Sequence, residues 1–344
     1  MYKLLDWLHP HIDKLDWYWL SMNPKAISLL EQYPEKIDWS VLSFNPNAIS
    51  LLEQNPEKID WKRLSSNTHP GAIRLLEQNL DKICWYMLSV NTHPGAVRLL
   101  KQNLDKIEWA CLSINTSPLA ISILERNLDK INWNNFSRNT NPLAIRLLEK
   151  YPEKIYWNNF SANPSPDAMT LIEQNIDNID WEWLSVNTNP LAIRILEQHP
   201  DKIEWIWLSQ NINAIRLLEQ YPEKIHWNTL SHNTGAIAIL EKNPDKINWK
   251  WLSQNPNAIR LLEKNPDKID WNCLSHNPSA IHLLEKNIDK INWKWLSENP
   301  NIFTIDYDWL KKRMDVIREE LMSKVWHPSR ITRCLEQGMD LEDI

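Results

Sequence analysis

The chain has 344 residues, a hydrophobic fraction of 43% and a net charge of −6 at pH 7. This mild negative charge gives no general reason to expect nucleic acid or an anionic membrane surface as a partner. The sequence contains only four glycines, which argues against glycine-rich phosphate loops and against sheets with tight turns. No stretch reaches the ~18 apolar residues of a membrane span, and no signal-like segment opens the chain. A soluble intracellular protein is therefore expected.

The cysteines predict neither disulfides nor a zinc site. Cys84, Cys111, Cys273 and Cys334 are far apart and form no CxxC pair. We expect free thiols in a reducing compartment. No motif of a metalloprotease, an α/β-hydrolase, a P-loop or an EF-hand is present, and the histidines occupy unrelated positions. The sequence therefore predicts a protein that is not an enzyme and that holds no cofactor and no metal.

One phrase recurs along most of the chain. In its clearest form it reads Lys58-Ile59-Asp60-Trp61, two variable residues, Leu64-Ser65, one further residue and Asn67. Self-similarity at a short period predicts a solenoid, in which each unit packs against its neighbours. We call the Trp of this phrase the ladder Trp and name each unit by it. The spacing is 22 residues twice, then 24 six times, then 22 four times, through Trp17, Trp39, Trp61, Trp85, Trp109, Trp133, Trp157, Trp181, Trp205, Trp227, Trp249, Trp271 and Trp293.

Each unit is predicted to form two short helices. Asp60 is a good N-cap, and Trp61 and Leu64 share one helical face. Ile59 does not fit that face, so we expect an extended lead-in that still reaches the core. The second helix carries an apolar stripe of the type Ala-Ile-x-Leu-Leu, and an Asn-Pro pair before it supplies an N-cap and a first-turn Pro. Helices this short need stacking on neighbours to be stable. The fold class predicted is all-α, a solenoid of about 12 helix-turn-helix repeats.

Residues 17–299 form the predicted repeat array. Residues 1–16 resemble half a repeat and are interpreted as an N-terminal cap, and residues 300–344 as a helical C-terminal cap of different design. Helices stacked at ~8–10 Å would give a rod or superhelix on the order of 100 Å long. The two extra residues of the 24-residue units fall between the two helices. They predict a bulge along one edge, which is either a neutral insertion, a binding edge or a change in curvature.

Two polar positions are identical in all units, Ser four residues after the ladder Trp and Asn six after it. Identity in every unit indicates a demand of stacking, so we expect the Asn amides to satisfy backbone groups in the turns. A row of ligands for a polymer is the alternative. The ladder Trp raises the same question, since exposed aromatic rows stack nucleic-acid bases. Because it shares a face with an apolar partner, we expect it to pack into the core, with its indole N–H on a backbone carbonyl.

Other positions vary and are the candidates for partner contacts. The site two residues after the ladder Trp holds residues as different as Asn and Trp, so it is expected to be partly exposed; its Trp residues either bind a partner or cover gaps between repeats. In the second helix an Arg recurs, which would align into a basic stripe for phosphates or acidic peptides. A Glu three residues later predicts neutralising ion pairs, for example between Arg74 and Glu77. The candidate residues are Trp183, Trp207, Trp251 and Trp295, and Arg74, Arg98, Arg146, Arg194, Arg216 and Arg260.

The phrase from Asn255 to Ser275, Asn-Pro-x-Ala-Ile-x-Leu-Leu-Glu-x-Asn-Pro-x-Lys-Ile-Asp-Trp-x-x-Leu-Ser, resembles the short Trp-containing repeat proteins of giant nucleocytoplasmic DNA viruses, the mimivirus-like group. The resemblance covers about residues 12–300, and the stretch from Trp326 to Asp340 is similar to a C-terminal motif of such proteins. It implies a viral protein in an infected host cell, in the host cytoplasm or in the virion. It implies no activity and no catalytic residues.

Three functions fit these patterns. The favoured one is a non-enzymatic scaffold for protein–protein interaction, because a long replicated surface suits extended partners. The second is a nucleic-acid-binding solenoid that uses the Arg stripe, and the third is a structural component of the virion. Nucleic acid as a partner is possible but not favoured, a membrane is not expected, and the patterns leave the protein partner and the oligomeric state open.

Overall fold

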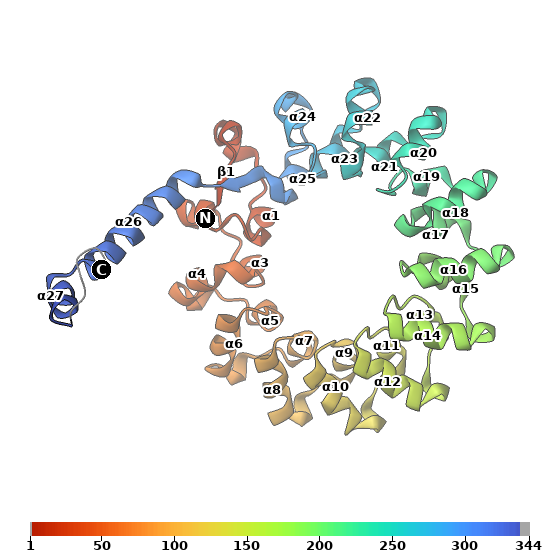
Figure 1. The fold of residues 1–344 in the computed structure, drawn as a ribbon, viewed down its shortest axis with the longest axis horizontal. Helices are drawn as coiled ribbons and strands as arrows, with labels where there is room; N and C mark the ends of the chain where they lie inside the picture. The colour runs from red at the N-terminus through yellow and green to blue at the C-terminus, as the bar shows by residue number, and fades with distance from the viewer. Residues whose placement is uncertain (1, 338–344) are drawn as a thin grey trace.

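The computed structural model describes residues 2–337 and confirms the all-α solenoid (Figure 1). Gly338, expected to end the last helix, and the acidic stretch from Asp340 to Ile344 lie outside the described residues. Each of the 13 ladder Trp residues begins a short helix, and these helices form the inner layer: α1 (Trp17–Met22), α3 (Trp39–Leu42), α5 (Trp61–Leu64), α7 (Trp85–Val90), α9 (Trp109–Ile114), α11 (Trp133–Phe136), α13 (Trp157–Ser161), α15 (Trp181–Val186), α17 (Trp205–Gln210), α19 (Trp227–Leu230), α21 (Trp249–Gln254), α23 (Trp271–His276) and α25 (Trp293–Glu298).

The second helices form the outer layer, and a 3-10 turn follows each of them. The outer helices are α2 (Ile27–Gln32), α4 (Ile49–Gln54), α6 (Pro70–Glu77), α8 (Pro94–Gln102), α10 (Pro118–Glu125), α12 (Pro142–Lys150), α14 (Pro166–Gln174), α16 (Pro190–Gln198), α18 (Ile215–Gln220), α20 (Ile237–Lys242), α22 (Ile259–Glu263) and α24 (Ile281–Glu285).

The core lies between the two layers and runs through all units. Leu64 of the inner helix and Ala72 and Leu76 of the outer helix are fully buried, and the same positions repeat around the chain. Ile59 has extended backbone angles and is 7% exposed, which confirms the lead-in that reaches the core. The ladder Trp residues are half-buried and pack against this core. No hydrogen bond from a ladder indole N–H to a backbone carbonyl occurs in residues 2–337, so that expectation is wrong.

The constant Ser and Asn connect consecutive units, as predicted. Ser65 Oγ donates to Trp61 O at 2.7 Å and accepts from the N–H of Cys84 in the next unit at 3.0 Å. Asn67 Nδ2 donates to Ser43 O at 3.1 Å and Asn45 O at 3.2 Å, both in the preceding unit. Because these groups are buried, each satisfied bond fixes the relation of one unit to the next. The structural interpretation of the two columns is confirmed.

The two extra residues of the 24-residue units lie in the turn between the inner and the outer helix. In the 22-residue Trp39 unit, a 3-10 turn at Pro46–Ala48 precedes the six-residue helix α4. In the 24-residue Trp85 unit, the helix begins directly at Pro94 and runs for nine residues as α8. The segments from Pro46 to Gln54 and from Pro94 to Gln102 both span nine residues, so the two extra residues, Thr92 and His93, lie in the turn before Pro94, between the two helices as the sequence predicted. Thr92 is exposed there, and His93 Nδ1 accepts from the Gly95 N–H at the start of α8.

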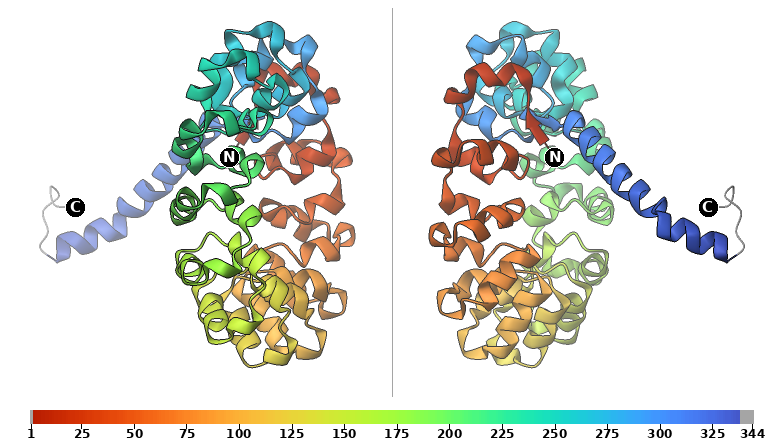
Figure 2. Two further views of the ribbon diagram at one scale, coloured as in Figure 1. Left: turned by 90° about the vertical axis from the view of Figure 1, so that its right-hand side faces the viewer. Right: turned by 90° about the vertical axis from the view of Figure 1, so that its left-hand side faces the viewer.

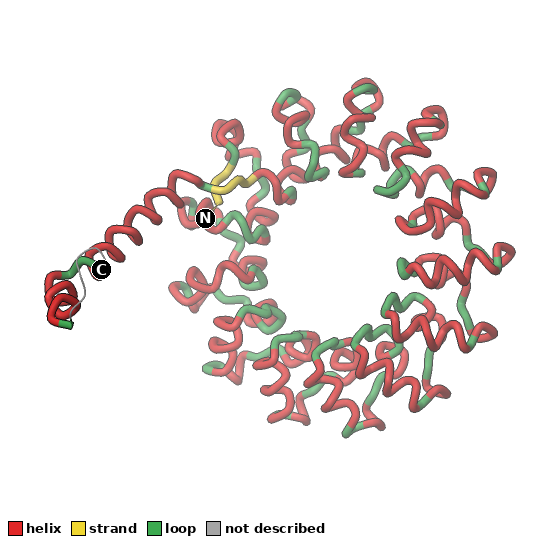
Figure 3. Tube along the Cα trace, viewed as in Figure 1, coloured by secondary structure: helices red, strands yellow, loops and turns green. Residues whose placement is uncertain are grey.

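The solenoid closes into a ring, and this is its largest departure from the expected open rod or superhelix (Figures 1 and 3). Strand β1 (Tyr2–Leu4) pairs antiparallel with β2 (Phe303–Ile305), with Lys3 opposite Thr304. Next to this pair, α25 packs against α1. A 3-10 segment, Asp6–Lys14, follows β1 and buries Leu8 completely. The Trp293 unit has no outer helix, and the N-terminal segment takes that place.

The contacts at this seam repeat those of the internal interfaces. The Asp16 N–H donates to Ser297 Oγ at 2.8 Å, as the Asp38 N–H does to Ser21 Oγ at 3.0 Å inside the array. Lys14 Nζ lies 5.1 Å from the centre of the Trp293 ring, and Lys36 Nζ lies at the same distance from the ring of the preceding ladder Trp. The first and last units are therefore neighbours, and the terminal segments join each other where the sequence predicted separate caps.

The two hydrogen bonds that the Asn amide donates inside the array are missing at the seam. Asn23 is buried, but its Nδ2 has no hydrogen-bond partner, whereas Asn45 Nδ2 in the next unit donates to Ser21 O and Asn23 O. The strand pair and the N-terminal 3-10 segment therefore stabilise the interface between the last and the first unit, where the Asn side chain donates no hydrogen bond.

The C-terminal helices α26 (Tyr307–Val325) and α27 (Pro328–Glu336) contain no buried residue. In Figure 2 they project away from the ring. Met314 and Leu321 remain exposed on α26. Residues 306–337 therefore do not cover the core of the last unit, which the strand pair and the N-terminal segment close.

Candidate functional site

The ring separates the two sets of candidate residues. Trp183, Trp207, Trp251 and Trp295 all belong to inner helices, and each is 41–43% exposed. Partial exposure is confirmed for these four Trp residues, whereas Val41, Cys111 and Cys273 at the same position are buried. The six candidate arginines all belong to outer helices and are exposed there. The first set therefore belongs to the inner layer of the ring and the second set to its outer layer (Figure 1).

The direction of the exposed inner residues follows from helical geometry. At 100° per residue, the buried Leu and Ser, three and four positions after the ladder Trp, point toward the outer layer. The residues one, two and five positions after the ladder Trp point roughly the opposite way, toward the centre. Ile206 and Trp207, for example, are 50% and 41% exposed. We call the surface formed by these three positions the inner wall.

The inner wall surrounds an opening that side chains do not fill. Thirteen helices packed at ~8–10 Å give a closed path of roughly 120 Å and, after subtracting side chains, an opening about 25 Å wide. Exposures of 40% or more at Tyr18, Tyr86 and Trp251 agree with open space in front of the wall. An α-helix with side chains, about 10–12 Å across, or an extended chain fits this width.

The exposed Trp side chains of the inner wall lie on one part of it, while Phe44, Tyr86 and Ile114 are the exposed large apolar residues of the other part. Between Trp181 and Trp19, counted forward through the seam, five of the variable positions hold Trp. We call this part the aromatic arc. The opposite part holds Arg63, Asn135 and Asn159 at the same position. Only closure places Trp19 beside Trp295, so the sequence as a linear array did not reveal Trp19 as part of this surface. The exposed large apolar residues of the arc are Trp183, Val186, Ile206, Trp207, Trp251, Trp295 and Tyr18.

A depression lies between two of the arc's tryptophans. Trp251 and Trp295 belong to units two apart, and both line a pocket of about 640 Å³. Cys273 occupies the equivalent position in the unit between them and is 8% exposed. His276 lies edge-on to Trp295 at 5.8 Å and completes one side. A small side chain between two large ones thus makes a notch that an apolar side chain could enter.

Burial raises the pKa of the Cys273 thiol, and the nearby Asp270 carboxylate raises it further. A raised pKa lowers the thiolate fraction at any given pH, so alkylation should be slow. We expect iodoacetamide at pH 8 to modify the half-exposed Cys84 and Cys334 first and the buried Cys273 last, with the rate at Cys273 rising as the pH is raised. Peptide mass spectrometry over a time course measures this order. Equal rates for the three thiols in the folded protein, matching those in urea, would contradict the placement of Cys273.

The Trp183 and Trp207 part of the arc carries acidic neighbours. Trp207 Nε1 donates to Glu182 Oε1 at 3.1 Å, and Asp180 and Glu204 precede the two inner helices as N-caps. Helices α13, α15, α17 and α19 contain no Lys or Arg. This part of the wall is therefore both aromatic and acidic, which favours a cationic partner and disfavours a phosphate backbone.

The outer arginines do not form a continuous stripe. Arg74 and Arg98 are adjacent, but Ser122 interrupts the column before Arg146. Arg74 Nη2 pairs with Glu53 Oε1 of the preceding unit at 3.9 Å, and not with Glu77 of its own helix as the sequence suggested. The pair is exposed and adds little stability. The acidic residues nevertheless remain interleaved with the basic ones, as predicted.

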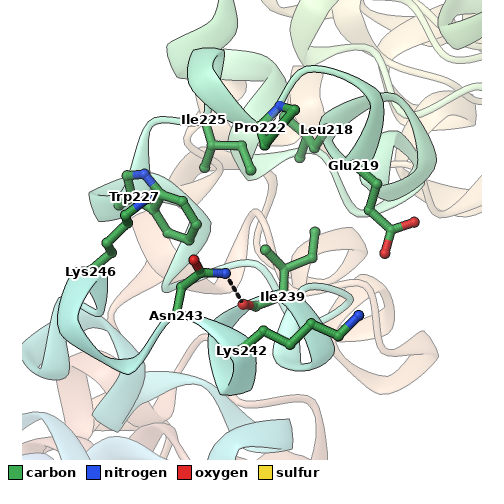
Figure 4. Close-up of a pocket in the computed structure, with 9 residues that line it drawn as sticks. All are labelled: Leu218, Glu219, Pro222, Ile225, Trp227, Ile239, Lys242, Asn243 and Lys246. Atoms are coloured by element: carbon green, nitrogen blue, oxygen red, sulfur yellow. Dashed lines mark hydrogen bonds between the residues drawn. The ribbon is translucent and has the colours of Figure 1, made fainter.

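Shallow grooves separate consecutive outer helices. Figure 4 shows the groove between α18 and α20, a pocket of about 370 Å³. Glu219 borders it on one side and Lys242 on the other, with Ile239 between them. Asn243 Nδ2 donates to Ile239 O at 2.9 Å and fixes the end of α20. Opposite charges thus face one another across this groove.

Comparison with protein-family models, with curated proteins and with solved structures finds no match to this chain. In the part of the chain that the structure describes, no three His, Cys, Asp or Glu side chains are grouped to hold a metal ion. Among the same residues, no helix combines the length and the apolar character that crossing a bilayer requires.

Proposed function

We propose that this ring is a non-enzymatic scaffold that binds a segment of a partner protein against its inner wall. The observation that carries the proposal is the aromatic arc, where exposed Trp side chains gather on one side of an open ring. Exposed Trp residues that line pockets are typical anchors of protein interfaces. The notch between Trp251 and Trp295 offers such an anchor point.

The acidic character near Trp183 supports a partner segment that carries Lys or Arg. A cation stacked on an exposed Trp gains from the ring quadrupole, and the chain already uses this contact internally. Lys58 Nζ lies 4.5 Å from the centre of the Trp39 ring, and Lys246 Nζ lies 4.6 Å from that of Trp227. A partner cation at Trp183 or Trp207 would repeat the same chemistry beside Glu182.

The test uses substitutions that the repeat itself provides. Asn occupies the Trp183 position in two other units, so Trp183→Asn, Trp207→Asn and Trp251→Asn should fold normally. We expect affinity capture from cells expressing the chain to lose its protein partner with this triple variant. The matched control, Arg74→Ser with Arg146→Ser and Arg194→Ser, should retain the partner, because Ser stands at this outer position in the Trp109 unit.

The nucleic-acid alternative predicts the reverse result. If capture depended on the arginines and nuclease treatment released the material, the outer stripe would be the interface. We instead expect binding to a duplex oligonucleotide to be weak at 50 mM salt and to change little up to 200 mM, because Glu side chains interrupt the basic column. A viral origin and a place in the host cytoplasm or the virion remain proposals that follow from the family resemblance.

A further inference from the structure

One groove between outer helices breaks the charge pattern of all the others. In each groove, one side comes from the position that Glu219 occupies in Figure 4 and the other from the position of Lys242. The first position is Glu in every unit with an outer helix except one, where it is Lys101. In sequence order the facing pairs are Glu31 and Gln54, Glu53 and Gln78, Glu77 and Gln102, Lys101 and Arg126, Glu125 and Lys150, Glu149 and Gln174, Glu173 and Gln198, Glu197 and Gln220, Glu219 and Lys242, Glu241 and Lys264, and Glu263 and Lys286.

The exception is the groove between α8 and α10. Wherever another groove has a cation on its second side, a Glu stands on the first side. Here Lys101 and Arg126 stand on the two sides, and Arg98 lines the same pocket. None of these three cations makes an ion pair within residues 2–337, and no carboxylate lines the pocket. The site therefore has positive charge without a compensating anion.

The same groove is also larger than the groove between α18 and α20 and the groove between α10 and α12. Its volume is about 570 Å³, against about 370 Å³ between α18 and α20 and about 260 Å³ between α10 and α12. Leu104 and Leu119 line it and are 46% and 43% exposed. A concave site of 300–1,000 Å³ with apolar walls and a few converging polar groups is typical of small-ligand sites.

We propose that the groove between α8 and α10 binds an amphipathic anion, a phosphate or carboxylate head group attached to an apolar body. The guanidinium groups of Arg98 and Arg126 and the Lys101 ammonium hold the head group through charge-assisted hydrogen bonds. The apolar body packs on Leu104 and Leu119. This site lies on the outer rim and is independent of partner binding at the inner wall.

The first experiment titrates the full chain with four probes and follows binding by calorimetry. Phenyl phosphate and benzoate carry both a head group and a body, inorganic phosphate lacks the body, and phenol lacks the charge. We expect one site for phenyl phosphate or benzoate, and the tighter of the two identifies the head group. Inorganic phosphate should bind at least about tenfold more weakly, and phenol should not bind. Equal affinity for inorganic and phenyl phosphate, or no binding of either aromatic anion at millimolar concentration, would overturn the assignment.

The repeat supplies a loss-of-function and a gain-of-function variant. Lys101→Glu restores the residue of all other units, so it should fold, and we expect it to weaken binding at least about tenfold. Glu219→Lys places a third cation with Arg216 and Lys242 at the groove of Figure 4, where Pro222 and Gly235 stand in place of Leu104 and Leu119. Any gain in binding there should therefore be similar for phenyl phosphate and inorganic phosphate, and a preference for phenyl phosphate would contradict the role of the two leucines. An unchanged affinity of the Lys101→Glu variant for phenyl phosphate and benzoate would overturn the proposal. Displacement of phenyl phosphate from this groove by an oligonucleotide would also overturn the proposal, because the groove would then be a nucleic-acid site.

Discussion

Removal of strand β1 is expected to open the ring. The seam is the one interface between units that no covalent connection holds, and the Asn23 amide donates no hydrogen bond across it. Without Tyr2–Leu4, the pairing with Phe303–Ile305 and the buried contact of Leu4 are lost. The array should relax toward an open superhelix, with a radius of gyration larger by on the order of several Å. Small-angle X-ray scattering measures this change.

A matched pair of variants separates opening from general destabilisation. Leu4→Ala with Leu8→Ala truncates fully or nearly fully buried residues at the seam, and Leu218→Ala with Leu240→Ala does the same inside the array. Each Leu→Ala should cost about 2–5 kcal/mol locally. Only the seam variant should enlarge the particle, because the chain still connects the internal units. Equal radii for wild type and the strand deletion would show that closure does not depend on β1.

Asn187→Ala is expected to lower the free energy of unfolding by about 2–5 kcal/mol. Its Nδ2 donates to Ser161 O at 2.9 Å and Asn163 O at 3.0 Å, and its Oδ1 accepts from the Asn189 N–H at 2.9 Å. All of these groups lie in the stacking interface, and Asn187 is 2% exposed. Truncation leaves two carbonyls and one N–H without partners. The midpoint of urea unfolding and hydrogen exchange of α13 to α15 report the loss.

Asn23→Ala is the control for this measurement. Asn23 keeps only the bond that its Oδ1 accepts from the Lys25 N–H at 3.0 Å, and its Nδ2 donates to no partner. The difference between the two variants therefore reports the two bonds that Asn187 donates to the preceding unit. If both variants lost the same stability, the Asn column would not be what couples consecutive units.

The local structure could be predicted from the sequence because it is repeated many times. The identity of Ser65 and Asn67 with their counterparts in every unit indicated their stacking role, and tolerance of both Asn and Trp indicated an exposed position. The ladder Trp was predicted less well. It shares a face with Leu64, yet the ring remains half-buried, and in several units, such as the Trp39 unit, a Lys lies over it.

Closure could not be derived from the repeat pattern, because each unit specifies only its relation to the next one. The small rotation between consecutive units depends on how individual side chains pack. The spacing of Leu and Ala in the repeat does not specify that angle. One signal was present in the sequence. The segment before Trp17 is half a unit, and the Trp293 unit stops after its first half. Which candidate residues share the inner wall depends on this closure, so Trp19 could not be grouped with Trp295.

Closure also sets a rule for how this chain can change in length. An open solenoid tolerates the gain or loss of a unit, because only its end moves. Here 13 units share a full turn, so consecutive units are rotated by about 28°. In a variant with 12 or 14 units, this rotation must change by about 2° at every interface, or the two strands remain unpaired. The closed geometry therefore disfavours duplication or deletion of a single unit, which is ordinarily the easiest mutation in a gene that encodes tandem repeats. The chain can diversify its repeats by substitution far more freely than by number.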